Sequence, residues 1–370
     1  MCSSDLLLVA ANLQVFLTTA VYGVSRQSQV VSSAIAMVRN GYPELGIAIG
    51  LFIGVFPVLR MGLLTAVLGM VKLGRRPAWL GHAFRLANTL QVWAMPEVFA
   101  VAAVVACARL GVELSVVVGD GALCFAAGAA LMLVTRATLD KRAVWDAIGD
   151  AGQAPVALSA NQQTAPDKAH TPRPIACLSC GRLAPASDAG QPCPRCHATL
   201  HTRKPQAVAR TTALLVAAAL LYIPANLYPM ATLPIGLTPT HYTVLQGVVD
   251  LMDAKLIGLA LLVLVASFVI PLAKLAGLAW CIASVVRRSR RHLVAKTRTF
   301  AVIEEIGRWS MIDPFVIACF VPVTQYNALI SGSAEAAAPA FAAVVILTTL
   351  AAHTFDPRLM WDAAHPQSPR

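Results

Sequence analysis

The sequence Cys177-Leu178-Ser179-Cys180, followed by Cys193-Pro194-Arg195-Cys196, divides the chain near its middle. It belongs to a short polar region, and long apolar stretches lie on either side of it. The pattern Cys-x2-Cys-x12-Cys-x2-Cys places two thiols on each of two tight turns, a spacing that lets four thiolates surround one metal ion. Because four thiolates leave no open position, we expect a closed, structural Zn2+ site made by Cys177, Cys180, Cys193 and Cys196.

Other interpretations of these cysteines remain open at the level of the sequence. His197 follows Cys196 directly and is an alternative ligand. Two disulfides or a redox-active pair would use the same four residues, although a cytoplasmic location would disfavour stable disulfides. Four further cysteines occur singly in apolar segments and are expected to pack as small hydrophobic side chains: Cys107, Cys124, Cys281 and Cys319.

The composition sets the class of protein. Hydrophobic residues make up 57% of the 370 residues and charged residues 13%, whereas a soluble domain has about 45–50% and about 25%. A helix needs about 20 apolar residues to cross a bilayer. We therefore predict an all-α integral membrane protein with eight spans, which begin near Leu6, Gly46, Arg85, Val116, Thr211, Leu256, Phe300 and Pro339.

The distribution of charge predicts the topology. The net charge is +11, and the loops rich in Lys and Arg alternate with loops that contain few cations. By the positive-inside rule, both termini and the cysteine region are cytoplasmic. The excess of basic residues is then explained by topology and by contact with anionic lipid, so we expect no nucleic-acid partner. The segment from Met1 to Asp5 lacks the basic start of a cleaved signal peptide.

Short motifs recur in the same order in the two halves of the chain, 214 to 216 positions apart. This recurrence predicts two repeated four-helix membrane modules in parallel orientation, over residues 1–148 and 205–370. A polar linker, 149–174, and a zinc ribbon, 175–204, would join them. The matched pairs are Ala11-Asn12-Leu13 with Ala225-Asn226-Leu227, Pro57–Arg60 with Pro271–Lys274, Trp93–Phe99 with Trp309–Phe315, and Arg142–Asp146 with Arg358–Asp362.

Polar residues inside the predicted spans are concentrated in the second module. Such residues are costly in a bilayer and usually face the protein interior or a water-filled cavity. The candidates for substrate binding are Asn226, Ser267, Lys274, Ser310, Asp313 and Thr348. The first module keeps the charged residues Arg60 and Glu97 at matching positions, but has Ile53, Ala94 and Met132 in place of the neutral polar residues Ser267, Ser310 and Thr348.

Two interpretations of this set remain open. Lys274 and Asp313 would form an ion pair that docks two helices, or the whole set would line a pocket for a charged or zwitterionic head group. The sequence contains no glycine-rich phosphate-binding loop, and no spacing suggests a catalytic set, so we expect a protein that is not an enzyme.

Several motifs together resemble the paraquat-inducible protein A (PqiA/LetA-like) family. The resemblance is closest between Cys177 and Asp362 and weaker between Leu6 and Asp146. The motifs that carry it are Pro224-Ala225-Asn226-Leu227-Tyr228-Pro229, Pro271-Leu272-x-Lys274, Gly307-Arg308-Trp309-Ser310-Met311-x-Asp313-x-Phe315 and Phe355-Asp356-Pro357-Arg358-x-x-Trp361-Asp362.

The resemblance implies a protein of the bacterial inner membrane that works with a periplasmic MCE-domain protein, whose tunnel leads towards the outer membrane. It implies that phospholipid or a similar amphiphile is moved, with the polar set around Lys274 as the candidate lipid site. Members of this family carry two zinc ribbons, and this sequence departs from the pattern because it contains one. A cysteine-based redox or envelope-stress sensor, and a membrane anchor for the MCE partner, are the alternative functions.

Overall fold

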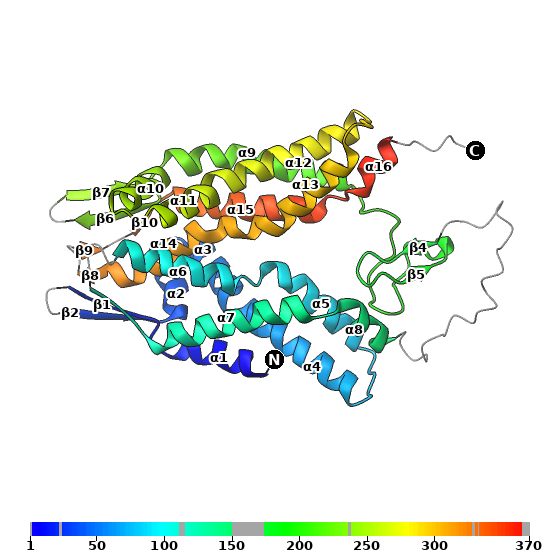
Figure 1. Ribbon diagram of the computed structural model, residues 1–370, viewed down its shortest axis with the longest axis horizontal. Coiled ribbons are helices and arrows are strands. Elements are labelled where there is room, and N and C mark those ends of the chain that lie inside the picture. The colour runs from blue at the N-terminus through cyan, green and yellow to red at the C-terminus, as the bar shows by residue number, and fades with distance from the viewer. Residues whose placement is uncertain are drawn as a thin grey trace.

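The computed structural model describes residues 2–21, 24–110, 115–149, 174–235, 238–327, 330–331 and 333–364. Most of the predicted linker 149–174 lies outside these residues. The helices lie roughly along one long axis, with short hairpins at one end and the cysteine region at the other (Figure 1). We call residues 2–149 the first half and residues 205–364 the second half.

The first half alternates helices with a small sheet. Its strands form a three-stranded antiparallel sheet in the order β2-β1-β3. The elements are α1 (Cys2–Leu13), β1 (Leu17–Val21), β2 (Val24–Ser28), α2 (Val30–Arg39), α3 (Pro43–Ile49), η1 (Gly50–Val55), α4 (Phe56–Lys72), α5 (Leu80–Trp93), α6 (Pro96–Leu110), β3 (Ser115–Val118), α7 (Asp120–Thr138) and α8 (Lys141–Ile148).

The second half follows the cysteine region, which contains β4 (Ile175–Ala176), β5 (Leu183–Ala184) and η3 (Ala186–Asp188). Its main sheet has the order β10-β6-β7, and β8 pairs with β9. The elements are α9 (Ala207–Leu227), β6 (Ala231–Ile235), β7 (Thr238–Tyr242), α10 (Val244–Asp253), α11 (Ile257–Leu264), η4 (Val265–Val269), α12 (Ile270–Val286), α13 (Leu293–Ile306), η5 (Gly307–Met311), α14 (Ile312–Thr324), β8 (Gln325–Asn327), β9 (Ile330–Ser331), β10 (Ser333–Ala334), α15 (Ala337–Thr354) and α16 (Arg358–Ala364).

The two halves share an order of elements. Each starts with a helix, a hairpin and a ten-residue helix, α2 or α10. A wide π-helical segment, η1 or η4, then leads into a 17-residue helix, α4 or α12. Pro57 and Pro271 lie where the π-helical turn passes into the α-helix, inside the continuous segments Pro43–Lys72 and Ile257–Val286, and a proline without a backbone N–H is a common cause of such an irregularity.

The number of membrane spans differs from the prediction. Among the described residues, six helical segments are long and apolar enough to cross a bilayer, not eight. The predicted first span fails because α1 ends at Leu13 and the chain continues into β1, where threonines favour a strand. The predicted seventh span is α13 and α14, which the 3-10 turn η5 interrupts. The six segments are Pro43–Lys72, Leu80–Ala108, Asp120–Thr138, Ala207–Leu227, Ile257–Val286 and Ala337–Thr354.

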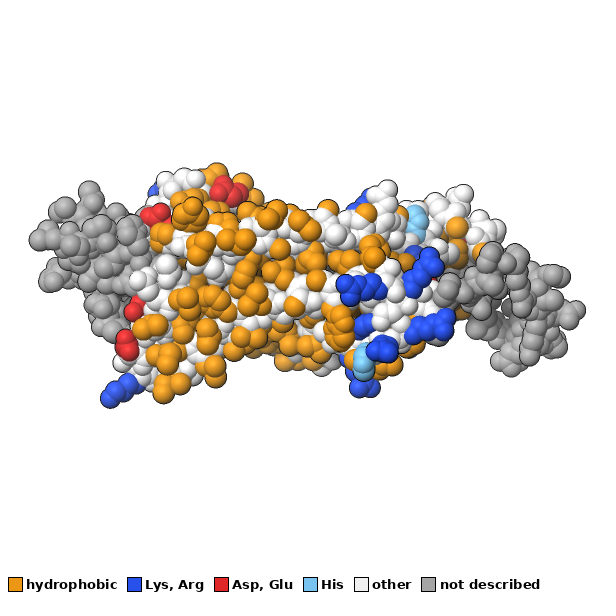
Figure 2. All heavy atoms as spheres, turned by 90° about the horizontal axis from the view of Figure 1, so that it is seen from above, with side chains coloured by type: hydrophobic (Ala, Val, Ile, Leu, Met, Phe, Trp, Pro, Cys, Tyr) orange, Lys and Arg blue, Asp and Glu red, His pale blue; other side chains and the backbone are white. Residues whose placement is uncertain are grey.

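The predicted all-α fold class is also incomplete, because the structure contains short β-sheets that were not predicted. The surface nevertheless has the character of a membrane protein. A broad band of hydrophobic side chains separates an end where most of the visible charges are acidic from an end where they are basic (Figure 2). This distribution matches a molecule that is surrounded by lipid along its middle.

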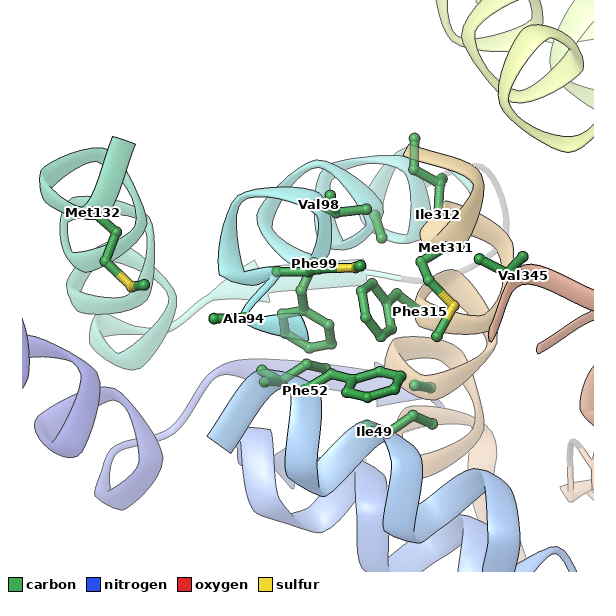
Figure 3. Close-up of a cluster of buried hydrophobic side chains, with 14 of the residues drawn as sticks. Ile49, Phe52, Ala94, Val98, Phe99, Met132, Met311, Ile312, Phe315 and Val345 are labelled. Carbon is green, nitrogen blue, oxygen red and sulfur yellow. The ribbon is translucent and has the colours of Figure 1, made fainter. Parts of the chain in front are cut away.

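The halves meet through α6 and α14, which pack against each other. Phe99 of α6 and Phe315 of α14 are fully buried, with ring centroids 5.7 Å apart and ring planes at 74°. This edge-to-face arrangement is favoured for aromatic pairs. Phe52 and Met311 lie beside the two rings in the same cluster (Figure 3). The contact between the halves is therefore apolar at this level.

The cysteine region contacts the first half and is linked to the second. The second cysteine turn approaches α5 so closely that a Cβ on Gly81 would lie 1.9 Å from the Arg195 carbonyl oxygen. Arg195 Nη1 also lies 3.4 Å from Asp146 Oδ1 on α8. The chain that leaves the region is fixed to the second half by Arg203, which binds both carboxylate oxygens of Asp362 at 2.6 and 2.9 Å.

We predict that Gly81→Ala destabilises the protein, because the added Cβ cannot fit against the Arg195 carbonyl without moving backbone. Overpacking of this kind costs about 1–3 kcal/mol. The control is Gly69→Ala in α4, where a Cβ meets nothing within 4 Å; there the change should stabilise by up to about 1 kcal/mol. Thermal unfolding of the detergent-solubilised variants measures both effects. Equal melting temperatures for the two variants would contradict the packing described.

Candidate functional site

The four predicted metal ligands come together at the end of the molecule that carries β4 and β5. The Sγ atoms of Cys177, Cys180, Cys193 and Cys196 all lie within 4.8 Å of one another, and all four side chains are buried. Cys177 Sγ is 3.5 Å from Cys196 Sγ, and Cys180 Sγ is 3.7 Å from Cys193 Sγ. These separations are far longer than the disulfide bond of about 2.05 Å.

The backbone of each cysteine pair forms the same turn. Gly181 and His197 follow the second cysteine of their pairs, and both have left-handed backbone conformations, with φ of 73° and 56°. Gly181 N donates to Cys177 O, and His197 N donates to Cys193 O. His197 is thus placed by its backbone, and its ring lies 6.1 Å from that of His82 rather than among the thiols.

The donor set fits zinc. Sulfur atoms about 2.3 Å from a tetrahedral Zn2+ lie about 3.8 Å apart, close to the distances between these thiols. Hydrogen bonding to Cys193 and Cys196, together with burial, raises the pKa of the Cys180 thiol. Four ionised thiolates therefore need a cation among them, and a bound metal would supply it.

The second candidate site lies between the helices of the second half, around Lys274. The side chain of Lys274 is 2% exposed. Its Nζ donates to the carbonyl oxygen of Gly307 at 3.0 Å and to Thr349 Oγ1 at 3.3 Å. These contacts join α12 to η5 and α15, and they give Lys274 partners other than the Asp313 carboxylate that the sequence suggested.

Four other predicted residues are buried around these elements. Ser267, Ser310, Asp313 and Thr348 are at most 6% exposed. Ser310 Oγ donates to Gly307 O at 2.8 Å, the same carbonyl that Lys274 uses. Ser267 lies on the π-helical segment η4, which packs against η5, and π-helical turns occur frequently at functional sites.

Asn226 lies apart from this group. The helices α9 and α15 are antiparallel: Thr211 and Thr354 are in contact at one end, and Ala337 N donates to Pro229 O at the other. That register places Asn226 roughly 14 Å along the axis from Thr348, at about 1.5 Å per residue. Its side-chain amide instead donates to Tyr222 O in its own helix at 2.8 Å.

Sequence reasoning missed two groups that bind Lys274 directly. One is Thr349, whose neighbour Thr348 was chosen instead; Thr348 Oγ1 donates to Val345 O within α15. The other is the Gly307 carbonyl, which is exposed to Lys274 because η5 breaks the regular helix. A glycine before Arg308 in an apolar segment was the signal for such a break. A Cβ at Gly307 would lie 2.8 Å from Lys274 Cε.

These features together define a multi-pass membrane protein with buried polar side chains between its helices and a four-cysteine site suited to a metal. Comparison with known proteins then assigns the chain to a family. The chain belongs to the paraquat-inducible protein A family, since the model of that family matches residues 1–149 and 208–365. The family predicted from the motifs is thereby confirmed.

Named relatives are transport and tunnel proteins. Intermembrane transport protein PqiA of Escherichia coli (strain K12) is 29% identical over 358 residues, which cover 96% of this chain and 83% of that protein. Lipophilic envelope-spanning tunnel protein A of the same strain is 27% identical over 278 residues, 75% of this chain and 62% of that protein. No solved structure gives a significant match.

We predict that Cys180→Ser and Cys193→Ser each abolish metal binding, because a hydroxyl is a poor replacement for a thiolate ligand. Elemental analysis of the purified chain should find one zinc per molecule in the parent and at most about a fifth of that in each variant. The control is Cys281→Ser, which changes a buried thiol of α12 outside the cluster and should keep the zinc. Full zinc in Cys180→Ser would contradict the assignment of these ligands.

Proposed function

We propose that this chain is a subunit of the bacterial inner membrane that loads or unloads phospholipid for a periplasmic MCE-domain protein, whose tunnel connects the two membranes. The observation that carries the proposal is the buried polar cluster around Lys274, inside the second half of a membrane protein. The names of its relatives, intermembrane transport protein and envelope-spanning tunnel protein, support a lipid-like cargo. No chemical reaction is involved in this role, so the chain is not an enzyme.

The chemistry of Lys274 suits a phospholipid head group. An ammonium group has three N–H donors, and two of them have acceptors among the described residues. A buried ammonium ion is expensive unless it is paired. A lipid phosphate oxygen would accept the third N–H and supply negative charge.

The first half keeps Arg60 and Glu97 at the positions of Lys274 and Asp313 but replaces the neutral polar residues by apolar ones, which favours the second half as the site of this head-group binding. Ile53, Ala94 and Met132 match Ser267, Ser310 and Thr348 and are at most 3% exposed. Ala94 and Met132 are part of a cluster of hydrophobic side chains (Figure 3). We infer that residues 1–148 and 205–370 are duplicated modules, of which the second handles the lipid.

The proposed orientation follows from charge. The end of the molecule that carries the cysteine region is rich in Lys and Arg (Figure 2), and basic loops remain in the cytoplasm. Both termini and a zinc ribbon over residues 175–204 would then be cytoplasmic. The zinc would be structural and would hold the two modules together. The hairpins β1-β2 and β6-β7 at the opposite end (Figure 1) would face the periplasm and the MCE partner.

We predict that Lys274→Met reduces lipid capture about tenfold, because a charge-assisted hydrogen bond to phosphate is lost. The measurement is photocrosslinking of a phosphatidylethanolamine with a diazirine on its head group to the chain in nanodiscs, with the modified peptides mapped to α12, η5 and α15. The control is Lys296→Met. Lys296 is equally buried, but its Nζ binds Ser284 and Ser289 far from η5.

Two experiments distinguish the proposed lipid site from the alternative functions: crosslinking of Lys274→Met and treatment with a mild oxidant. Unchanged crosslinking to α12, η5 and α15 in Lys274→Met would exclude Lys274 as the lipid site. A cysteine-based sensor would lose zinc and form disulfides under mild oxidant, whereas the structural site should keep its metal.

We also predict that a periplasmic MCE-domain protein of the host copurifies with the tagged chain and that Lys274→Met leaves this binding unchanged. The reason is that the polar cluster lies between helices, away from the hairpins that would face the partner. Quantitative mass spectrometry of the purified membrane complex measures the ratio. If Lys274→Met keeps both the partner and full lipid transport between membranes, the chain is an anchor rather than a lipid-handling subunit.

A further inference from the structure

A group of buried charges lies where the two halves meet. Arg308 Nη1 of η5 is 3.2 Å from Glu97 Oε1 of α6, and Arg136 Nη1 of α7 is 4.0 Å from the same oxygen. Arg136 also pairs with Glu305 of α13. Arg60 of α4 is within electrostatic reach of Glu97 and Arg136. We call Arg60, Arg136 and Arg308 the interhalf arginine cluster.

The charges in this cluster do not balance. Two guanidinium groups, those of Arg136 and Arg308, pair with one buried carboxylate, Glu97, which is 8% exposed, and the charge of Arg60 also interacts with it. The other carboxylate, Glu305, has a side chain that is 65% exposed, so solvent weakens its effect. Uncompensated positive charge in a low-dielectric region is costly, and a single carboxylate cannot pair fully with three cations.

Arg60 is the residue that the ion pairs fail to explain. Its side chain is 3% exposed, and its Nε has no hydrogen-bond partner among the described residues. The Nε of Arg308 is also buried and has no hydrogen-bond partner among the described residues. A purely structural role accounts for the contacts of Arg308 and Arg136 with Glu97, because they join the halves. A structural role of this kind does not explain why a third guanidinium, that of Arg60, is buried with an N–H donor that has no acceptor among the described residues.

One side of the cluster lies near the end of a membrane-spanning segment. Lys141 begins α8, just beyond the end of the span Asp120–Thr138. Partial burial and the nearby guanidinium groups of Arg60 and Arg136 lower the pKa of Lys141. Arg136 and Lys141 therefore lie near the basic end of the hydrophobic band, whereas Arg60 and Glu97 lie near the middle of the segments Pro43–Lys72 and Leu80–Ala108.

We propose that the interhalf arginine cluster is a second anion site, which binds a phosphate group through Arg60, Arg136 and Arg308. Guanidinium groups present paired N–H donors that match phosphate oxygens, and the bound anion would neutralise the charge that Glu97 leaves unpaired. Both sites border η5, because the Gly307 carbonyl accepts from Lys274 and the side chain of the next residue, Arg308, donates to Glu97. It goes beyond the function proposed above and does not depend on lipid binding at Lys274.

The test uses the full-length chain in nanodiscs of phosphatidylglycerol and phosphatidylcholine, with the same head-group diazirine probe. We expect crosslinked peptides from α6 and α7, which are not among the peptides expected for the Lys274 site. Arg136→Gln and Arg60→Gln should each lower this crosslinking about tenfold. Glu97→Gln keeps the shape of the side chain but removes the competing charge, so crosslinking should rise. Lys274→Met should leave crosslinking at this site unchanged, which distinguishes it from the first site.

Excess inorganic phosphate identifies the source of the anion. If it displaces the probe, the site is supported as one that accepts free phosphate; if it does not, the site is supported as one that requires a lipid head group. Arg136 is 22% exposed in its side chain, so Arg136→Gln provides a readout even if Arg60→Gln fails to fold. The proposal is overturned if crosslinking to α6 and α7 is equal in the parent and in Arg136→Gln, or if Glu97→Gln lowers it.

Discussion

The hydrogen bond from Lys274 Nζ to the Gly307 carbonyl is the interaction on which the membrane part of this structure depends. A buried ammonium needs an acceptor that a regular helix does not offer, because helical carbonyls are already bonded within the helix. The 3-10 turn η5 provides that carbonyl, and glycine lets Lys274 approach closely. One break in a helix therefore makes the polar cluster of the second half.

The same turn connects the two halves. Gly307 contacts Lys274, and Arg308, the next residue, reaches across to Glu97. The halves also meet through Phe99 and Phe315, which lie in sequence motifs that match between the two halves. The cysteine region, which contacts Gly81 and is tied to Asp362, restrains both halves at one end.

The sequence was sufficient for the family, the four-cysteine cluster and most of the apolar helices, because each depends on local spacing or on length. The sequence alone did not predict the features that depend on contacts between residues far apart in the chain. Hydropathy extended the first span through Leu13 into a strand, and it could not detect the break at η5. The sequence left a Lys274–Asp313 ion pair as one of two interpretations, but spacing alone could not bring Lys274 to the Gly307 carbonyl and Thr349, to which its Nζ donates. The contact of Arg308 with Glu97 crosses between halves and leaves no periodic signal.

The central claim is that the buried polar cluster of the second half holds a phospholipid head group. The most direct measurement is an electron cryomicroscopy map of the full chain in nanodiscs made from native lipid. We expect phosphate density about 3 Å from Lys274 Nζ, with the acyl chains extending out between α12 and α15. Density that shows Lys274 bonded only to protein groups, with the space beside it filled by side chains, would contradict the account.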